Sequence, residues 1–570
     1  MSFGVRLGLM VSSRAPGAAG EPLLSDELRH ECGIAALYWL DEPMAPEGPA
    51  SLAAGDPNRS ASRLGTPADG DVTPLMPRIL LDLQNRGQLA AGISRFNPDH
   101  PQLVDTFKDV GTVTEVFRMS RPQEHLDILE RYAGPACIGH TRYATCGIES
   151  ATHAQPFERH HGRRWKWFSF AFNGQLANYT QLRDRLLARQ AYHFALNTDT
   201  EIIMHQLSYG LRGDRQPNLV SVMRKLGRLF DGSYNLAFLN AMGDMFVARD
   251  PLGFRPLCYG FEGRLFAAAS ESAALTNLGF SDVRTLEPGT MALVHEGKIT
   301  FRRFAPARRH SHCFFEWVYF ANVASEIDSA SVYLSRMRSG QRLAEKEDQP
   351  IGPDCIVVPV PDTAKAAADA FAFKLGIPSV EGLIRNRYVG RTFIQPLATR
   401  GNAARSKYSP LRAVLEGKRV FLVEDSIVRS TTLQSLVDQM RSRGGAKEIH
   451  VRVACPPIVA PCFYGIDMST RGELFAPPYV GPRYKGRLSE AAAARMAKRL
   501  GVDSLRYLDV QDLGPCIQVP QDGIPNRPYG RLGAPDLCLG CVLGRYPTPS
   551  GRKLLARARR AKGGGKRTYE

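Results

Sequence analysis

The sequence predicts two successive folds: an α+β domain built on layered sheets, then an α/β domain with a parallel sheet. Residues 32 to about 300 carry short strand-like runs separated by turn signals, such as Tyr234–Leu239 and Met291–Val294. From about residue 350, strands alternate with helices, which indicates parallel strands joined by helical crossovers. The chain has 570 residues, 44% of them hydrophobic, so it is long enough for two or more packed cores.

The N-terminal region is expected to begin with a loose leader and to contain one insertion. Residues 1–31 hold a short apolar patch, Leu7–Val11, which is too short for the apolar region of a signal peptide. Residues 41–75 are rich in Pro, Ala, Gly, Ser and Asp, which predicts a surface insertion with no packed core. The layered domain is therefore expected to span residues 32–300, interrupted by this insertion.

Two strand–helix units mark the second domain. Cys355–Val360 and Arg419–Val423 have the composition of buried strands, and helix-like patterns follow them over Thr363–Leu375 and Thr432–Arg443. The expected divisions are a parallel domain over 301–510, a C-terminal segment over 511–547 and a basic tail over 548–570.

Charge and cysteine content indicate the partners and the cellular compartment to expect for the protein. The formal net charge is +17, partly from the tail Gly551–Glu570. Such a tail could bind nucleic acid or anionic partners, but we favour a solvated, partly disordered end with no nucleic-acid partner. No apolar run approaches the roughly 20 residues of a membrane span, so no membrane association is expected. The 11 cysteines are scattered, which favours a reducing, cytoplasmic compartment.

Residues 421–432 form the most informative stretch of the chain. A short apolar run ends in the carboxylates Glu424 and Asp425, a hydroxyl-rich turn follows, and a helix-like pattern begins near Leu433. The N-terminus of a helix with free N–H groups and nearby hydroxyls suits a phosphate. Two adjacent carboxylates suit ribose hydroxyls and Mg²⁺. The stretch therefore predicts a sugar-phosphate site.

Cys32 precedes an apolar strand in the string Arg29–Leu37. A lone cysteine in this position is more often a small core residue. Four further strings follow in order and favour a catalytic role: Asn85–Gln88, Gly139–Tyr143, Phe172–Gln175 and Thr198–Glu201. Together, the five strings resemble the class II glutamine amidotransferases, in which an N-terminal cysteine is the nucleophile. The resemblance implies a four-layer αββα fold of the N-terminal-nucleophile type.

The resemblance assigns roles to individual residues. Removal of the leader would give Cys32 a free α-amino group, whose pKa of roughly 7.7–8.0 suits a general base. Asn173 and Gly174 would form the oxyanion hole. Arg142 would hold the α-carboxylate of glutamine and Asp199 its α-amino group. Taken singly, these residues also fit a structural ion pair (Arg142), a helix cap (Asp199) and a hairpin turn (Asn173–Gly174).

The second half resembles the type I phosphoribosyltransferases at residues 424–432. Further strings narrow the resemblance to the amidophosphoribosyltransferase family, from Cys32 to about Pro547: Arg249–Pro256, Phe315–Ala321, Val360–Thr363, Asn386–Phe393 and Cys462–Asp467. Members of this family transfer ammonia from glutamine to 5-phosphoribosyl 1-pyrophosphate, the first step of purine synthesis. Where the family usually has Asp, Gly and His, this chain has Glu424, Ser430 and Asn85.

The family resemblance implies one substrate site and one Mg²⁺ per subunit. Arg385–Pro396 resembles a mobile loop that closes over the substrate. Mg²⁺ is expected near Thr363, Glu424 and Asp425. The residues expected to bind phosphoribosyl pyrophosphate are Asp362, Thr363, Arg387, Arg391, Glu424, Asp425, Ser426, Ile427, Val428, Arg429, Ser430, Thr431 and Thr432.

Four cysteines resemble the ligands of the iron–sulfur branch of this family. Cys538 and Cys541 alone could bind zinc or no metal. Together with Cys313 and Cys462, they suggest a structural [4Fe–4S] cluster. Cys516 is a competing candidate for one ligand position.

The resemblance also implies glutamine and phosphoribosyl pyrophosphate as substrates, feedback inhibition by purine nucleotides and a homotetramer. Two alternatives stay open from the sequence. One is an ammonia-dependent paralogue with an idle glutaminase half. The other is a regulator that binds the sugar pyrophosphate without turnover.

Overall fold

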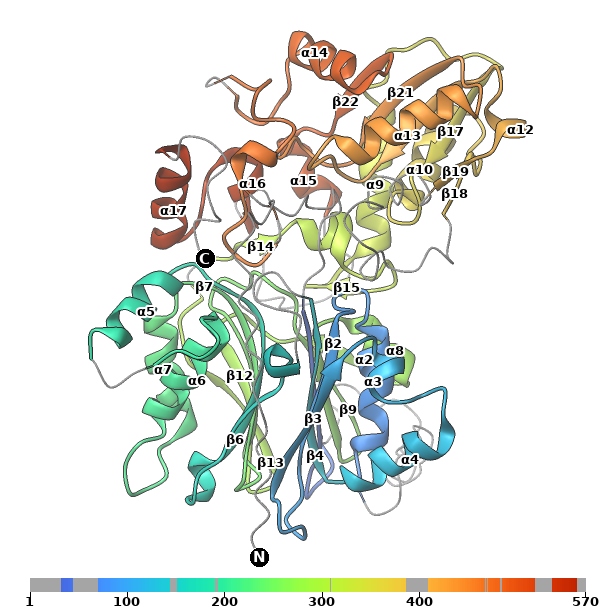
Figure 1. Ribbon diagram of the computed structural model, residues 1–570. Helices are drawn as coiled ribbons and strands as arrows, with labels where there is room; N and C mark the ends of the chain where they lie inside the picture. Colours follow the sequence, from blue (N-terminus) through green and yellow to red (C-terminus); the bar gives the residue numbers. More distant parts are fainter. Residues whose placement is uncertain are drawn as a thin grey trace, which may run out of the picture.

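The computed structural model describes residues 32–44, 70–143, 151–189, 193–307, 309–385, 408–466, 468, 470–481, 484–517 and 536–560. Figure 1 shows a lower part with two sheets packed face to face and an upper part built on a parallel sheet. The leader, residues 1–31, lies outside the described residues, as do Arg387 and Arg391.

Two antiparallel sheets form the centre of the N-terminal domain. The first has the strand order β11-β9-β10-β1-β4-β2-β3 and the second β13-β12-β8-β7-β6-β5. The strands of the first sheet are β1 (Gly33–Trp39), β2 (Ala90–Phe96), β3 (Val104–Val110), β4 (Ala136–Arg142), β9 (Cys258–Glu262), β10 (Leu265–Ala269) and β11 (Val283–Thr285). Those of the second are β5 (Phe157–Arg159), β6 (Phe168–Leu176), β7 (Gly232–Asn240), β8 (Met245–Arg249), β12 (Thr290–His295) and β13 (Lys298–Arg303).

Helices cover the outer face of each sheet, so the predicted four-layer αββα fold is confirmed (Figure 1). The first sheet carries α2 (Met76–Asp82), α3 (Val113–Val116), α4 (Pro122–Arg131) and α8 (Ser272–Leu278). The second carries α5 (Tyr179–Leu187), α6 (Asp199–Gly210) and α7 (Leu219–Leu229). Because both faces of the central strands are covered, β7 is buried along its whole length, which explains why the apolar residues 236–239 follow one another without alternation.

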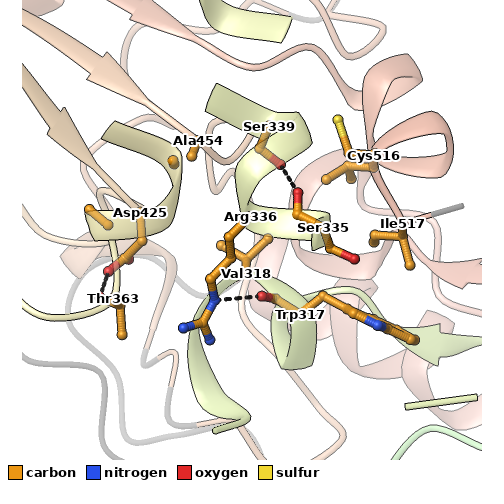
Figure 2. A pocket seen from close by; sticks show the side chains of 13 residues that line it. Trp317, Val318, Ser335, Arg336, Ser339, Thr363, Asp425, Ala454, Cys516 and Ile517 are labelled. Carbon is orange, nitrogen blue, oxygen red and sulfur yellow. Dashed lines mark hydrogen bonds between the residues drawn. The ribbon is translucent and has the colours of Figure 1, made fainter. Parts of the chain in front are cut away.

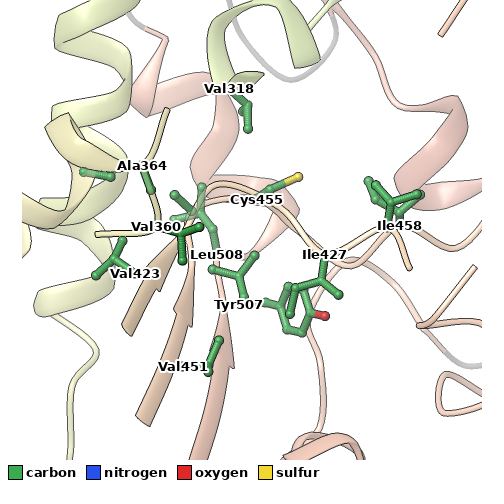
Figure 3. Close-up of a cluster of buried hydrophobic side chains, with 14 of the residues drawn as sticks. Val318, Val360, Ala364, Val423, Ile427, Val451, Cys455, Ile458, Tyr507 and Leu508 are labelled. Carbon is green, nitrogen blue, oxygen red and sulfur yellow. The ribbon is translucent and has the colours of Figure 1, made fainter. Parts of the chain in front are cut away.

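The C-terminal domain has the predicted parallel sheet, in the order β17-β20-β21-β22. Its strands are β17 (Cys355–Pro359), β20 (Arg419–Glu424), β21 (Glu448–Val453) and β22 (Ser504–Tyr507), and its main helices are α9 (Val332–Ala344), α10 (Lys365–Leu375), α13 (Thr431–Ser442) and α14 (Glu490–Leu500). Figure 3 shows apolar side chains of this core, including Val360, Val423 and Val451. Short strands β18 (Leu383–Arg385) and β19 (Tyr408–Pro410) form a separate two-stranded antiparallel sheet.

Short elements join the two domains. They include the two-residue strands β14 (His312–Cys313), β15 (Glu326–Ile327) and β16 (Ala330–Ser331), and the π-helical turn η4 (Glu316–Phe320). The C-terminal segment contributes α15 (Val510–Cys516), β23 (Leu537–Cys538) and α16 (Gly540–Leu543). β23 pairs in parallel with β14, which ties the end of the chain to the start of the second domain.

Three sequence-based boundaries need correction. The predicted insertion is wrong at its C-terminal edge, because Val72 and Leu75 are buried against the first sheet and residues 73–75 form a 3₁₀ turn. Strand β13 runs past residue 300, so the first domain extends further than expected. The tail is not a disordered end over α17 (Pro549–Arg560), where Leu554 and Leu555 are buried and give the helix an apolar face.

Candidate active sites and cysteine cluster

Cys32 lies immediately before β1, a central strand of the first sheet, and is partly exposed. Its Sγ donates a hydrogen bond to the backbone carbonyl of Tyr143, at 3.7 Å. Ser270 connects this strand to the second sheet, because its Oγ accepts from the Ile34 N–H at 3.0 Å and from Asn173 Nδ2 at 3.4 Å. Ser270 therefore links the strand that follows Cys32 to Asn173 of the second sheet.

Asn173 and Gly174 lie inside strand β6, not in a hairpin turn, so the turn interpretation is wrong. They pair with Asn235 and Tyr234 of β7. Gly174 has φ +147°, and a Cβ there would come within 2.1 Å of the Ser233 carbonyl oxygen. Only glycine fits this backbone, which places a side-chain amide and a backbone N–H next to each other in adjacent residues of β6.

Arg142 ends strand β4 and is buried. Its charge lowers the pKa of Lys108 and of His140, although burial is the larger cause for both; the pKa of Lys108 is about 8 and that of His140 about 3. Lys108 donates to the carbonyls of Ala154 and Pro156, at 2.7 and 3.0 Å. The positive charge gathered near Arg142 suits the carboxylate of an amino acid.

Asp199 is the first residue of α6, and the cap of this helix is Thr198, whose hydroxyl accepts from the Glu201 N–H. The helix-cap interpretation of Asp199 is therefore wrong. Its carboxylate accepts from the Leu176 N–H at 3.2 Å, at the end of the strand that carries Asn173. Burial raises the pKa of Asp199 to about 6. An ammonium group placed beside it would favour the charged carboxylate.

Glu424 ends strand β20, and Asp425 follows at the carboxyl edge of the parallel sheet. The Thr363 hydroxyl donates to one oxygen of Asp425, and the Ser426 hydroxyl donates to the other at 2.6 Å. Hydroxyl and carboxylate oxygens are the ligands that Mg²⁺ prefers, and Mg²⁺ usually takes one or two carboxylates plus phosphate oxygens. The donor set therefore fits Mg²⁺ completed by substrate. Among the described residues, no three His, Cys, Asp or Glu side chains converge on one ion.

The turn after Asp425 leads directly into α13. Ile427 and Val428 are buried, so they anchor the turn through their side chains and leave only backbone groups for a ligand. Ser430 precedes the helix with φ −101° and ψ −13°, and its side chain makes no capping hydrogen bond. Its backbone is one that any residue adopts, so the replacement of the family's glycine needs no altered turn. The helix N-terminus remains a suitable phosphate cradle.

The Val360–Thr363 turn lies beside the same edge. Asp362 is exposed and pairs with Arg385, whose Nη1 lies 2.7 Å from the Asp362 carboxylate. Tyr408 donates its hydroxyl to the Pro361 carbonyl at 3.2 Å. Arg385 is the one described arginine of the expected mobile loop, since Arg387 and Arg391 lie outside the described residues.

A pocket extends from Asp425 and Thr363 toward the C-terminal segment (Figure 2). Arg336 borders it and donates to the Trp317 carbonyl at 2.9 Å. Most of the lining is apolar, with contributions from Trp317, Val318, Ala364, Ala367, Ala454, Leu513 and Ile517. Cys516 also lines this pocket, and burial raises the pKa of its thiol to about 11.

Cys313, Cys462, Cys538 and Cys541 line a different cavity, together with Arg255 and Tyr464 among others. The β14–β23 pairing sets Cys313 opposite Cys538. Burial raises the pKa of Cys541 far above its usual range, and the neighbouring sulfurs of the other three cysteines raise it further. A single tetrahedral zinc takes sulfur ligands about 2.3 Å from the metal, whereas the cysteine ligands of a multi-atom cluster lie further apart. Four thiols around a larger space fit a multi-atom cluster, and Cys516 is not among them.

Two residues of the glutaminase site escaped the sequence-based interpretation. Ser270 follows strand β10, where a serine before a helix is typical of a cap, and only the fold reveals its contacts to Ile34 and Asn173. Lys108 lies on β3 in a polar strand, where a lysine on a solvated face is the ordinary expectation. Neither position carries a sequence signal for a site.

Among the described helices, none combines the length and apolar character that crossing a lipid bilayer requires. The fold and its two sites define the class: a glutamine amidotransferase of the N-terminal-nucleophile type joined to a type I phosphoribosyltransferase fold. Comparison with known proteins agrees, since residues 140–277 match the family described as glutamine amidotransferase domain.

Relatives match almost the whole chain. The amidophosphoribosyltransferase of Methanothermobacter thermautotrophicus is 38% identical over 92% of this chain and 96% of its own, and that of Bacillus subtilis is 36% identical over 82% and 90%. The solved glutamine phosphoribosylpyrophosphate amidotransferase from B. subtilis, complexed with ADP and GMP, superimposes with TM-score 0.71 and 31% identity, covering 91% of this chain and 98% of that one. The chain belongs to the amidophosphoribosyltransferase family.

Proposed function

We propose that this chain releases ammonia from glutamine at Cys32 and adds it to C1 of 5-phosphoribosyl 1-pyrophosphate. The products are 5-phosphoribosylamine, glutamate and pyrophosphate, the first step of purine synthesis. The observation that carries the proposal is the arrangement around Ser270, which joins the Cys32 strand to Asn173. In the other half of the chain, the Thr363 hydroxyl donates a hydrogen bond to Asp425, within the segment that resembles the phosphoribosyltransferase motif.

Glutamine hydrolysis follows from the first site. The Cys32 thiolate attacks the side-chain amide carbon, and the α-amino group freed by removal of residues 1–31 takes the thiol proton and passes it to the leaving ammonia. Asn173 Nδ2 and the Gly174 N–H stabilise the oxyanion. Water then cleaves the thioester to give glutamate. Arg142 and Asp199 hold the two charged ends of the substrate.

Phosphoribosyl transfer follows from the second site. The C1–O bond breaks, pyrophosphate leaves with the electron pair, and ammonia attacks C1 and loses a proton. The turn 426–432 holds the 5′-phosphate, and Glu424 and Asp425 hold the ribose hydroxyls. Mg²⁺, one per subunit and held by Thr363, Glu424 and Asp425, would neutralise charge on the leaving group. Removing divalent ions with EDTA should abolish ammonia-dependent transfer, and added Mg²⁺ should restore it.

Ammonia must stay neutral to act as a nucleophile, and water would protonate most of it. The pocket beside Asp425 has a mostly apolar lining, which includes Trp317 and Ile517. This lining supports an enclosed path for ammonia in the transferase half. Of the loop Arg385–Pro396, which is expected to cover the substrate, only Arg385 belongs to the described residues.

The remaining proposals concern cofactor, regulation and assembly. Cys313, Cys462, Cys538 and Cys541 would hold a structural [4Fe–4S] cluster, supported by their shared cavity. Purine nucleotides would inhibit the enzyme, since the solved relative is complexed with ADP and GMP. A homotetramer is proposed from the family resemblance, and light scattering of the purified protein would test it.

The Cys32→Ala variant tests the assignment of the nucleophile. We expect it to lose glutamine-dependent phosphoribosylamine formation by about 10³-fold or more and to keep the ammonia-dependent reaction. N-terminal sequencing of the unaltered protein should show a chain that begins at Cys32. A variant that keeps full glutamine activity would overturn the assignment, and unaltered protein that is active only with ammonia would favour an idle glutaminase half.

A further inference from the structure

We propose that Glu316, a buried carboxylate of the transferase half, positions two parts of the glutaminase site: the part that binds the glutamine carboxylate and the part that stabilises the oxyanion. Glutamine hydrolysis would then depend on the transferase half. The inference rests on the proposed function of the Cys32 site. Glu316 is a positioning residue here, because it contacts other residues of the protein and not the reacting atoms.

Glu316 begins the turn η4 and lies between two arginines of the glutaminase half. Its Oε2 is 2.6 Å from Arg86 Nη2, and its Oε1 is 3.3 Å from Arg255 Nη1. Arg86 also pairs with Glu271, at 2.6 Å. At least 98% of each of these four side chains is shielded from solvent. Two positive and two negative charges therefore form a balanced network at the junction of the two halves.

The first set of contacts runs from Glu316 through Arg86 to Arg142, the residue proposed to bind the glutamine carboxylate. Gly87, the residue after Arg86, packs so closely on strand β4 that a Cβ there would come within 2.6 Å of the Arg142 carbonyl carbon. Arg86 is held in place by its two carboxylates, so the 85–88 turn is fixed against the backbone of Arg142. A shift of Arg86 would be transmitted to the residue proposed to hold the glutamine carboxylate.

The second set of contacts runs from Glu316 through Arg255 to Gly174, which is proposed to stabilise the oxyanion. Arg255 Nη2 donates to the Tyr464 carbonyl at 2.7 Å. Gly465 comes next, with φ +103°, and a Cβ there would meet Arg255 Nη2 at 3.0 Å and the Gly174 carbonyl carbon at 3.3 Å. Arg255 and the 464–465 backbone of the transferase half therefore pack directly on Gly174, which is proposed to donate its N–H to the oxyanion.

The same turn reaches the transferase site. Trp317 and Val318 follow Glu316 in η4 and line the pocket that Asp425 and Thr363 border (Figure 2). Glu271 crosses the junction in the opposite direction, since it accepts from the Asn322 N–H at 2.7 Å and from the Ser325 hydroxyl at 2.9 Å. The network thus gives a continuous physical connection between the two sites.

The Glu316→Gln variant tests this inference. A neutral amide cannot balance both arginines, so Arg86 and Arg255 should move. We expect glutamine-dependent activity to fall about 10-fold or more, with a raised KM for glutamine, while ammonia-dependent activity stays within about twofold. A purely structural role would lower both activities in proportion.

The matched control is Glu347→Gln. Glu347 pairs with Arg452 at 2.5 Å and is equally buried, but both residues lie in the transferase half. This variant should leave the ratio of glutamine- to ammonia-dependent activity unchanged. If Glu316→Gln does not fold, Asn85→Ala replaces it. Asn85 Nδ2 donates to Glu271 of its own half at 2.7 Å and crosses the same junction to the Phe320 carbonyl at 3.2 Å, without carrying a charge.

An unchanged activity ratio in the folded variant would overturn the inference. Failure of the proposed function would look different. In that case the unaltered protein itself would form no phosphoribosylamine from glutamine, or Cys32→Ala would retain that activity. If both of those controls behave as expected, an unchanged ratio in Glu316→Gln or Asn85→Ala refutes only the positioning role.

Discussion

At the scale of single residues, the glutaminase site is a pair of opposite electrostatic environments. Arg142 ends a strand in a region where burial, and to a lesser degree the charge of Arg142, lowers the pKa of Lys108 and His153. Asp199 is a carboxylate whose pKa burial raises, at the first turn of α6. We propose that a zwitterionic amino acid matches this arrangement at both ends, which would give selectivity for free glutamine over a glutamine side chain within a peptide.

Glutamine binding should therefore depend on pH through Asp199. Its pKa of about 6 lies above the ordinary carboxyl value, so the carboxylate is charged above pH 6 and protonated below it. In a Cys32→Ala background, which binds without turnover, the Kd for glutamine should be flat above about pH 7 and rise about tenfold per unit below pH 6. Isothermal titration calorimetry at each pH measures this Kd.

The control for this prediction adds Asp199→Asn to the same background. That protein should bind glutamine more weakly and with no change between pH 5 and 8. A weakening that sets in only near pH 4, the ordinary range of an aspartate, would contradict the prediction.

At this scale the sequence proposes residues for the chemistry but does not indicate the residues that contact them. Cys32, Asn173, Asp199 and Asp425 stand in recognisable strings. Ser270 does not, because its contacts join strands that are far apart in the chain, and an isolated serine before a helix predicts only a cap.

At the scale of elements, the C-terminal segment contacts both domains. β23 pairs with β14, and the α17 end docks on the first domain through the Ser550 N–H, which donates to Asp231 at 2.9 Å. Composition alone favoured a solvated tail because arginines and lysines dominate it. The two buried leucines, Leu554 and Leu555, were the contrary signal.

The cysteine cavity should bind iron and sulfide in equal amounts. Anaerobically purified protein is expected to contain about four of each per chain, and Cys538→Ser should lose most of both because it removes one of four ligands. Iron and acid-labile sulfide assays measure the content. Cys516→Ser is the control and should retain it, since Cys516 lines the other pocket. One zinc per chain without sulfide would contradict the cluster.

At the scale of the whole molecule, the junction between the halves is a buried part of the structure. Arg86 and Arg255 contribute from one half and Glu316 from the other. A layered sheet domain and a parallel α/β domain could be predicted from strand and helix patterns, because those patterns are local. The four-layer αββα arrangement followed from the family resemblance. The junction could not be predicted, because its contacts join residues that neither periodicity nor spacing relates.

The two halves should unfold together. Calorimetry of the unaltered protein is expected to give one cooperative transition, because separating the halves would expose the charge network. Arg86→Met leaves Glu271 and Glu316 without their shared partner, at a cost of about 3–5 kcal/mol, and should lower and split the transition. Two resolved transitions in the unaltered protein would refute this expectation.

The pairing of β14 with β23 also has a consequence for how the protein is made. Cys313 leaves the ribosome on the order of 10–40 s before Cys538, at ordinary rates of synthesis. During that interval the first thiol has no partner strand, and the glutaminase half must fold with this edge open. Completion of the cysteine set is therefore a late step, taken only once the chain has been translated almost to its end.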